Sequence, residues 1–163
     1  MKKAIFLDRD GVINKELGYV SKLENFVFTD DIIPTLKKFQ ENGFLFVVIT
    51  NQGGIAKGFY THADVAIIHE HMISVLKENE IIISEIYYCP HHPDSGNCIC
   101  RKPDSGMLEK AIARFNIDPS KSFMIGDKER DFMAGEKAGV RGIQIESDSP
   151  LIEIANKIIA GTY

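Results

Sequence analysis

The sequence predicts an α/β fold in which one mainly parallel sheet carries helices on both faces, a doubly wound arrangement. Short apolar runs recur along the chain, and segments with helical periodicity lie between them. Alternation of this kind is typical of βαβ units, which build parallel sheets. No repeat, low-complexity tract or linker interrupts the pattern, so we expect residues 1–163 to form a single domain.

The apolar runs are the predicted strands. The first, at residues 4–7, has the length and the unbroken apolar character of a strand that is buried on both faces. The remaining runs lie at residues 44–49, 81–83 together with 86–89, 123–125 and 142–145. Two irregular segments, residues 11–28 and 90–103, follow strand ends, which is the side of an open α/β sheet where ligands bind.

The predicted helices are recognised by their ends and by their apolar stripes. We expect them at residues 34–39, from a capping box at residues 61–64 to residue 76, at residues 103–115 and at residues 131–138. Pro34 suits the first turn of its helix, and Gly139 suits the position just after the end of the last one.

Composition is typical of an ordinary globular protein and excludes several classes. Hydrophobic residues make up 44% of the chain, and no apolar stretch approaches the length of a membrane span. The apolar run that ends before Asp8 is too short for a secretory signal, so we expect a cytoplasmic protein. The formal net charge is −4 and no basic tract occurs, which gives no electrostatic case for nucleic acid. No apolar stripe is left over, and we expect a monomer.

Four polar segments directly follow predicted strands or the loops after them. They are Asp8-Arg9-Asp10-Gly11, Thr50-Asn51-Gln52-Gly53, Cys100-Arg101-Lys102-Pro103 and Gly126-Asp127-Lys128-Glu129-Arg130-Asp131. Together they supply a carboxylate pair, a hydroxyl beside glycine-rich backbone, a fixed cation and a second acidic pair. Phosphoryl transfer needs this inventory: a nucleophile, an acid/base, neutralising charge and oxygen ligands for a hard cation.

The ordered set resembles the motifs of the haloacid dehalogenase (HAD) superfamily of aspartate-nucleophile phosphatases. The D-x-D motif of that family matches Asp8 and Asp10, and its threonine or serine after a strand matches Thr50. The family lysine matches Lys102, and the G-D-x-x-x-D motif matches residues 126–131. The motifs occur in the family order over nearly the whole chain, which implies a Rossmann-like core.

The resemblance also implies a role for each matched residue. Asp8 would attack phosphorus and carry an aspartyl-phosphate, while Asp10 would protonate the leaving oxygen and then activate water. Mg²⁺ would be bound by the Asp8 carboxylate, the Asp10 backbone carbonyl and Asp127. Thr50 and nearby amides would hold phosphate oxygens, whose charge Lys102 would neutralise.

Three neighbouring residues are expected to support this site. Asn51 would orient Asp10 or the phosphate, and Lys128 and Asp131 would support the first set of ligands, with Lys128 close enough to contact substrate. For Lys128 and Asp131 the alternative is a charge pair at the start of a helix.

A second cluster of ligands lies between residues 89 and 100. Cys89, His91, Cys98 and Cys100 place three thiols and an imidazole within one short segment. These soft ligands suit a closed tetrahedral Zn²⁺ site, and metal would order a loop that has too little apolar content to fold alone. His91 is preferred as the fourth ligand, with His92 as its alternative. Buried or redox-active cysteines without metal are the other interpretation.

This loop is similar to that of HAD phosphatases with little or no cap domain, a group that includes heptose 1,7-bisphosphate and histidinol-phosphate phosphatases. In that group the zinc is structural. Residues 18–20, 50–58, 86–93 and 124–128 are closer to the heptose enzymes, which remove the 7-phosphate of D-glycero-D-manno-heptose 1,7-bisphosphate. The chain departs from them at Lys57, where arginine is common, at Gly53, where serine is common, and in a short spacer at residues 92–97.

A sugar bisphosphate needs a second anionic contact, for which Arg101, Lys57 and the backbone of Gly53 are candidates. Lys57 could equally be a solvated surface charge. Histidinol phosphate, the alternative substrate, would call for an acidic partner such as Glu16. A phosphoacceptor signalling domain would lack an acid at the position of Asp10, and a non-catalytic zinc module would not explain the carboxylates. The residues therefore favour a phosphatase that acts on a small phosphorylated molecule.

Overall fold

The protein, described here over residues 1–163 by a computed structural model, is built on one five-stranded sheet. The strands lie in the order β3-β2-β1-β4-β5, and every neighbouring pair is parallel. Their bounds are Lys3–Leu7 for β1, Phe44–Asn51 for β2, Ile83–Cys89 for β3, Phe123–Gly126 for β4 and Arg141–Gln144 for β5. The predicted parallel sheet is confirmed, except that residues 81 and 82 precede β3 instead of belonging to it.

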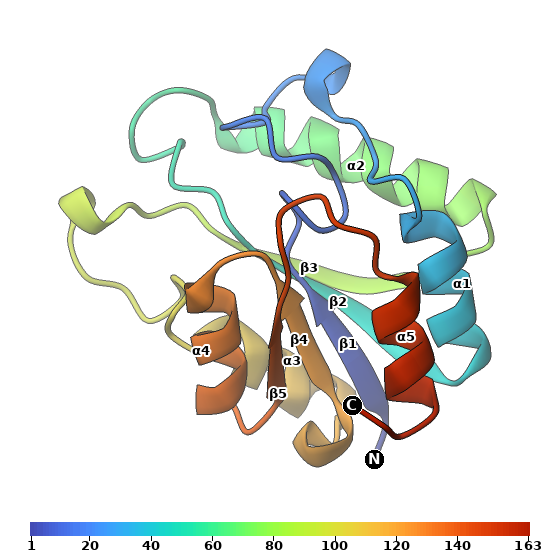
Figure 1. Ribbon diagram of the computed structural model, residues 1–163. Helices are drawn as coiled ribbons and strands as arrows, with labels where there is room; N and C mark the ends of the chain where they lie inside the picture. The colour runs from blue at the N-terminus through green and yellow to red at the C-terminus, as the bar shows by residue number, and fades with distance from the viewer.

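Five α-helices cover the two faces of this sheet (Figure 1). They are α1 (Ile32–Glu41), α2 (His62–Glu78), α3 (Gly106–Phe115), α4 (Glu129–Lys137) and α5 (Ile152–Ile159). Buried residues of α1, α2 and α5 form one hydrophobic cluster, and those of α3 and α4 form another on the opposite face. The doubly wound arrangement is therefore confirmed. None of these helices combines the length and the apolar character that crossing a membrane requires.

The alternation along β1 explains why the first apolar run is unbroken. Ile5 and Leu7 belong to the cluster under α1, α2 and α5, whereas Ala4 and Phe6 belong to the cluster under α3 and α4. All four side chains are fully buried. A strand at the centre of a sheet that is covered on both faces must be apolar at every position, and this requirement places β1 in the middle.

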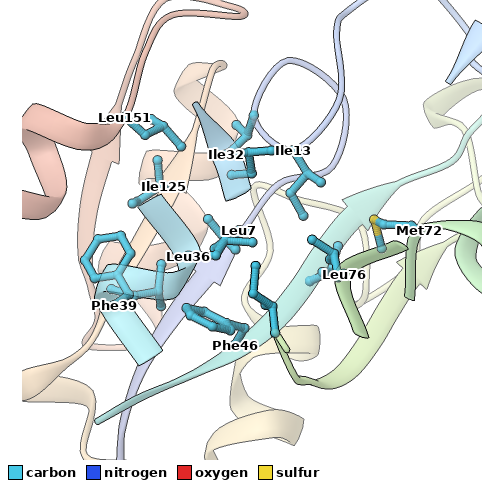
Figure 2. Packing of buried hydrophobic residues seen from close by; sticks show 14 of the residues in the cluster. Leu7, Ile13, Ile32, Leu36, Phe39, Phe46, Met72, Leu76, Ile125 and Leu151 are labelled. Carbon is cyan, nitrogen blue, oxygen red and sulfur yellow. The ribbon is translucent and has the colours of Figure 1, made fainter. Parts of the chain in front are cut away.

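The helix α1 shows how one apolar face docks on the sheet (Figure 2). Ile32, Leu36 and Phe39 recur at helical spacing and lie over Leu7 and Phe46 of the two central strands. All three helix residues are fully buried. Packing of this face, rather than helix propensity, holds α1 in place.

The helix α5 is the one helix that the sequence patterns did not predict. Its first backbone amides are capped from far along the chain, because the Asp31 carboxylate accepts hydrogen bonds from Leu151 N at 2.7 Å and Ile152 N at 2.8 Å. Asp31 itself precedes α1, so one carboxylate joins the starts of two neighbouring helices. The four predicted helices are present, with ends displaced by a few residues.

Two long connections lie at the carboxyl edge of the sheet, one between β1 and α1 and the other between β3 and α3. Neither contains more than a single 3₁₀ turn, at Leu23–Asn25 and Pro93–Ser95 respectively, so no cap domain stands over the sheet. The edge is therefore open, and the loops that follow β1, β2, β3 and β4 can build a site there.

Truncating the core face of α1 should test this packing. We expect Phe39→Ala to lower the free energy of unfolding by about 3–5 kcal/mol, because it removes a fully buried ring that stacks edge-on against Phe44 at a centroid distance of 5.5 Å. Denaturant-induced unfolding followed by circular dichroism measures the change. The control Ile82→Ala, at a side chain that is 70% exposed, should alter stability by no more than about 0.5 kcal/mol. Equal effects of the two substitutions would contradict the packing of α1.

Candidate active site

A polar cavity of about 310 Å³ opens at the carboxyl edge of the sheet. It lies where the chain order switches, because β1 has β2 on one side and β4 on the other, and ligands of open α/β sheets bind at this point. The lining consists of Asp8, Asp10, Glu16, Gly18, Tyr19, Thr50, Asn51, Gln52, Gly53, Tyr60, His92, Arg101 and Arg130.

A buried lysine joins the segments beneath this cavity. Lys102 Nζ lies 2.9 Å from Asp8 Oδ1 and 2.6 Å from Asp131 Oδ1, and it donates to Ile49 O at 2.6 Å. Burial disfavours the ammonium form, but the carboxylates of Asp8 and Asp131 outweigh it and raise the pKa of Lys102. The ammonium group is therefore a permanent positive charge beside Asp8.

Asp8 follows β1 and is almost fully buried. Its Oδ1 accepts a hydrogen bond from the backbone of Arg9 at 2.8 Å. Burial raises the pKa of Asp8 to about 7, while the positive charge of Lys102 acts in the opposite direction. An additional cation near this carboxylate would favour its ionised form.

The carboxylates offer a place for such a cation. Oxygen atoms of Asp8, Asp127 and Asp131 all lie within 4.8 Å of one another. Asp127 Oδ2 contacts Lys128 Nζ at 2.8 Å, whereas Asp127 Oδ1 is buried without any hydrogen-bond partner. Gly11 has a φ of +85°, and a Cβ there would lie 2.4 Å from Asp127 Oδ2, so only glycine permits this approach. Carboxylate oxygens with one buried atom unpaired fit a hard cation such as Mg²⁺.

Asp10 is held by a network of buried donors. Its Oδ1 accepts from Arg9 Nη2 at 3.0 Å and from Asn14 Nδ2 at 3.0 Å, and its Oδ2 accepts from Gln52 Nε2 at 3.0 Å. Arg9 is completely buried, and its other nitrogen Nη1 lies 3.3 Å from His69 Nε2. Burial lowers the pKa of His69 to about 4, so this imidazole is neutral beside the guanidinium.

Asn51 makes no hydrogen bond to Asp10, and its alternative role towards the phosphate stays a prediction, since Asn51 lines the cavity. Its Nδ2 donates to Lys102 O at 3.1 Å, and its Oδ1 accepts from Lys102 N at 3.0 Å. Asn51 therefore fixes the backbone that carries Lys102, while the neighbouring Gln52 contacts Asp10. No sequence motif pointed to Gln52, because its role depends on contacts between segments that are distant along the chain.

The four expected soft ligands come together in the loop after β3. His91 Nδ1 lies 3.4 Å from Cys89 Sγ and 3.3 Å from Cys100 Sγ, and Cys89 Sγ lies 3.6 Å from Cys98 Sγ. All three cysteines are free thiols. His92 is turned away from them, since its Nδ1 accepts from Asp94 N at 3.2 Å. The cluster could hold one Zn²⁺ ion, for which Zn–S bonds are about 2.3 Å.

The expected cationic contacts divide into two groups. Arg101 lines the cavity and donates from Nη1 to His91 O at 2.8 Å. Lys57 is exposed and lies about 6 Å from the ring centroids of Tyr19 and Phe59, outside the cavity lining. Arg130, which the motifs did not single out, lines the cavity without an ion-pair partner, and its Nε is buried and unpaired.

Comparison with known proteins identifies the relatives of this chain. A family model described as HAD-hydrolase-like matches residues 99–157. The chain is 44% identical to D-glycero-alpha-D-manno-heptose-1,7-bisphosphate 7-phosphatase of Photorhabdus laumondii, over 85% of this chain and 79% of that protein. It is 41% identical to D-glycero-beta-D-manno-heptose-1,7-bisphosphate 7-phosphatase of Pasteurella multocida, over 96% and 89%.

Solved structures agree with these relatives. The D,D-heptose 1,7-bisphosphate phosphatase of B. bronchiseptica, crystallised with magnesium and phosphate, superposes with a TM-score of 0.82 and 26% identity. The match covers 98% of this chain and 99% of that chain. By its fold, its relatives and the carboxylates at its sheet edge, the chain belongs to the D-glycero-D-manno-heptose-1,7-bisphosphate 7-phosphatase family of HAD-like hydrolases.

Proposed function

We propose that the protein is a Mg²⁺-dependent phosphatase that removes the 7-phosphate of D-glycero-D-manno-heptose 1,7-bisphosphate. The observation that carries this proposal is the contact of Lys102 with Asp8 and Asp131, beside an Asp127 oxygen that lacks a partner. The names of the relatives support the choice of substrate. The single domain, the monomeric state and the cytoplasmic location expected from the sequence stay predictions.

The residues around the cavity suit a two-step displacement. An Asp8 oxygen would attack phosphorus and form an aspartyl-phosphate while the bond to the leaving oxygen breaks. Asp10 would give a proton to that oxygen, which leaves as the sugar alcohol, and would then take a proton from the water that releases phosphate. Thr50 would hold the phosphoryl oxygens, and the charge of Lys102 beneath the cavity would help to neutralise them.

A cation completes the charge balance of this site. Mg²⁺ bound by the Asp8 carboxylate, the Asp10 backbone carbonyl and Asp127 would neutralise the phosphoryl group. Lys128 and Asp131 would keep these ligands in place, since Lys128 contacts Asp127 and Asp131 accepts from Lys128 N at 3.0 Å.

A phosphate-release assay tests the proposed reaction. With Mg²⁺ present, the wild type should release phosphate from the heptose bisphosphate faster than from histidinol phosphate or nucleotides. Asp8→Asn should abolish release because it removes the nucleophile, and Asp10→Asn should lower the rate about 10²–10⁴-fold because it removes the acid/base.

The control for these substitutions is Asp30→Asn, at an exposed carboxylate outside the cavity. It should leave phosphate release unchanged. Full activity of Asp8→Asn would contradict the mechanism, whereas a preference for histidinol phosphate would contradict the substrate and leave the mechanism intact.

The second phosphate of the bisphosphate, at carbon 1, is the distal phosphate that the enzyme does not remove. Binding it requires cationic side chains that are not already paired with carboxylates. Arg101 and Arg130 meet this condition, and each is a chain neighbour of one member of the Lys102–Asp131 ion pair. The two guanidinium groups therefore come from segments that are in contact below the cavity, and both can bind phosphate.

Substituting Arg130 tests this assignment. We expect Arg130→Met to raise KM for the bisphosphate about tenfold or more, since it removes charge-assisted hydrogen bonds, and to leave KM for the heptose 7-monophosphate nearly unchanged. Steady-state kinetics on the two sugars measure the difference, with the exposed Arg114→Met as the control. An equal rise in KM for both sugars would argue against contact with the distal phosphate.

We propose further that the loop after β3 binds one structural Zn²⁺ through Cys89, His91, Cys98 and Cys100. Burial raises the pKa of the Cys89 and Cys100 thiols, whereas at Cys98 hydrogen bonds from backbone amides outweigh burial and lower the pKa to about 7. A bound metal ion would favour the thiolate form of all three. The ion would order the loop that carries Arg101 and Lys102.

Metal analysis of purified variants tests the zinc site. The wild type should contain about one zinc per chain, and His91→Gln should lose most of it because a four-ligand site cannot close without the imidazole. The adjacent His92→Gln is the matched control and should retain zinc, since the His92 side chain lies outside the cluster. If His92→Gln loses zinc and His91→Gln keeps it, His92 is the ligand and His91 is not.

A further inference from the structure

A buried glutamine connects the two sides of the reacting centre. Gln52 follows β2 and is only 2% exposed. Its Nε2 donates one hydrogen bond to Asp10 Oδ2 at 3.0 Å and another to Thr50 Oγ1 at 2.9 Å. A side-chain amide has two N–H donors, so both are used on groups that line the cavity.

The orientation of this amide is determined by its partners. Gln52 Oε1 accepts a hydrogen bond from Tyr60 Oη at 2.7 Å and lies 3.5 Å from Arg9 Nη2. A carboxylate only accepts and a guanidinium only donates, so the amide must present its nitrogen to Asp10 and its oxygen to Arg9. Tyr60 can occupy its place because Gly54 lacks a side chain: a Cβ at Gly54 would lie 2.2 Å from Tyr60 Cε1.

These contacts have a chemical consequence for each partner. The Thr50 oxygen already accepts from Gln52, so the Thr50 hydroxyl proton remains available for a phosphate oxygen. The Asp10 carboxylate is held through both oxygens by Arg9, Asn14 and Gln52 and still lines the cavity. Of these three side chains, only that of Gln52 also donates a hydrogen bond to Thr50.

We propose that Tyr60 and Gln52 form a positioning pair that orients the Asp10 carboxylate for proton transfer to the leaving oxygen. The inference rests on the proposed function, because it requires Asp10 to act as the acid/base. In the first step the Asp8–phosphorus bond forms, the phosphorus–oxygen bond to the sugar breaks, and the proton of a protonated Asp10 carboxyl moves to the departing oxygen, which leaves Asp10 as a carboxylate. Both residues line the cavity, and the role proposed for them is exerted through Asp10.

Leaving groups distinguish this role from general support of the fold. A sugar alkoxide is a poor leaving group and needs the proton from Asp10, whereas a nitrophenolate leaves readily without it. The value of kcat/KM reports the steps through the first irreversible one, here formation of the aspartyl-phosphate. Loss of positioning should therefore lower kcat/KM for the sugar phosphate and spare the aryl phosphate.

The experiment compares Tyr60→Phe with wild type on the heptose bisphosphate and on p-nitrophenyl phosphate. We expect Tyr60→Phe to lower kcat/KM about tenfold for the sugar phosphate and less than about twofold for the aryl phosphate. The tenfold loss is only part of the full contribution of an acid/base, which is about 10²–10⁴-fold. The matched control Tyr87→Phe removes a hydroxyl on β3 outside the cavity and should change neither value. Equal losses on the two substrates, or no loss on the sugar phosphate, would overturn the proposal.

A double-mutant cycle supplies a second readout. If Tyr60 acts through Gln52, Tyr60→Phe should cause no further loss of kcat/KM for the sugar phosphate in a Gln52→Met background. Additive losses would overturn the pairing. The same test can be made on any alkyl phosphate that the wild type hydrolyses. If the heptose bisphosphate is the wrong substrate, the comparison of substrates with the wild type will show it. The effect of Tyr60→Phe on an alkyl phosphate then still decides the proposal.

Discussion

The ion pairs of Lys102 are the constraint on which the rest of the site depends. One fully buried ammonium group contacts Asp8 after β1, the carbonyl of Ile49 in β2 and Asp131 in α4. Removing the ammonium group would leave the buried carboxylates of Asp8 and Asp131 without their shared partner, which costs several kcal/mol. Asn51 fixes the Lys102 backbone from both sides. These contacts fix the position of a lysine that lies on an irregular loop.

The charged groups around this lysine include more carboxylates than cations. Three buried carboxylates, of Asp8, Asp127 and Asp131, are in contact with only two ammonium groups, those of Lys102 and Lys128. Burial keeps the pKa of Asp8 near 7, so its ionised form would gain from one more positive charge. A divalent cation at the unpaired oxygen of Asp127 would supply that charge and leave the site attractive to a phosphate. Under the proposed function, binding of the metal, ionisation of Asp8 and binding of the substrate would depend on one another.

The sequence predicted what depends on local pattern and missed what depends on distant contact. Motifs at strand ends located Asp8, Asp127 and Lys102 because the carboxyl ends of parallel strands converge. The helix α5 was missed because its cap comes from Asp31, far away along the chain. Arg9, Gln52 and Tyr60 were missed because a buried polar network is recognisable only when its partners are known. Asp10 was one of the two partners expected for Asn51, and the neighbouring Gln52 makes that contact.

Gly53 determines how closely the loop after β3 packs against the end of β2. A Cβ at Gly53 would lie 3.1 Å from Arg101 Nη1 and 3.2 Å from His91 O, so the loop after β3 packs against bare backbone at this position. A larger residue at position 53 would require the Arg101 guanidinium or the His91 carbonyl to shift by a few tenths of an ångström. Arg101 lines the cavity and donates to His91 O, so the bare backbone at Gly53 lets these two groups lie close to the end of β2.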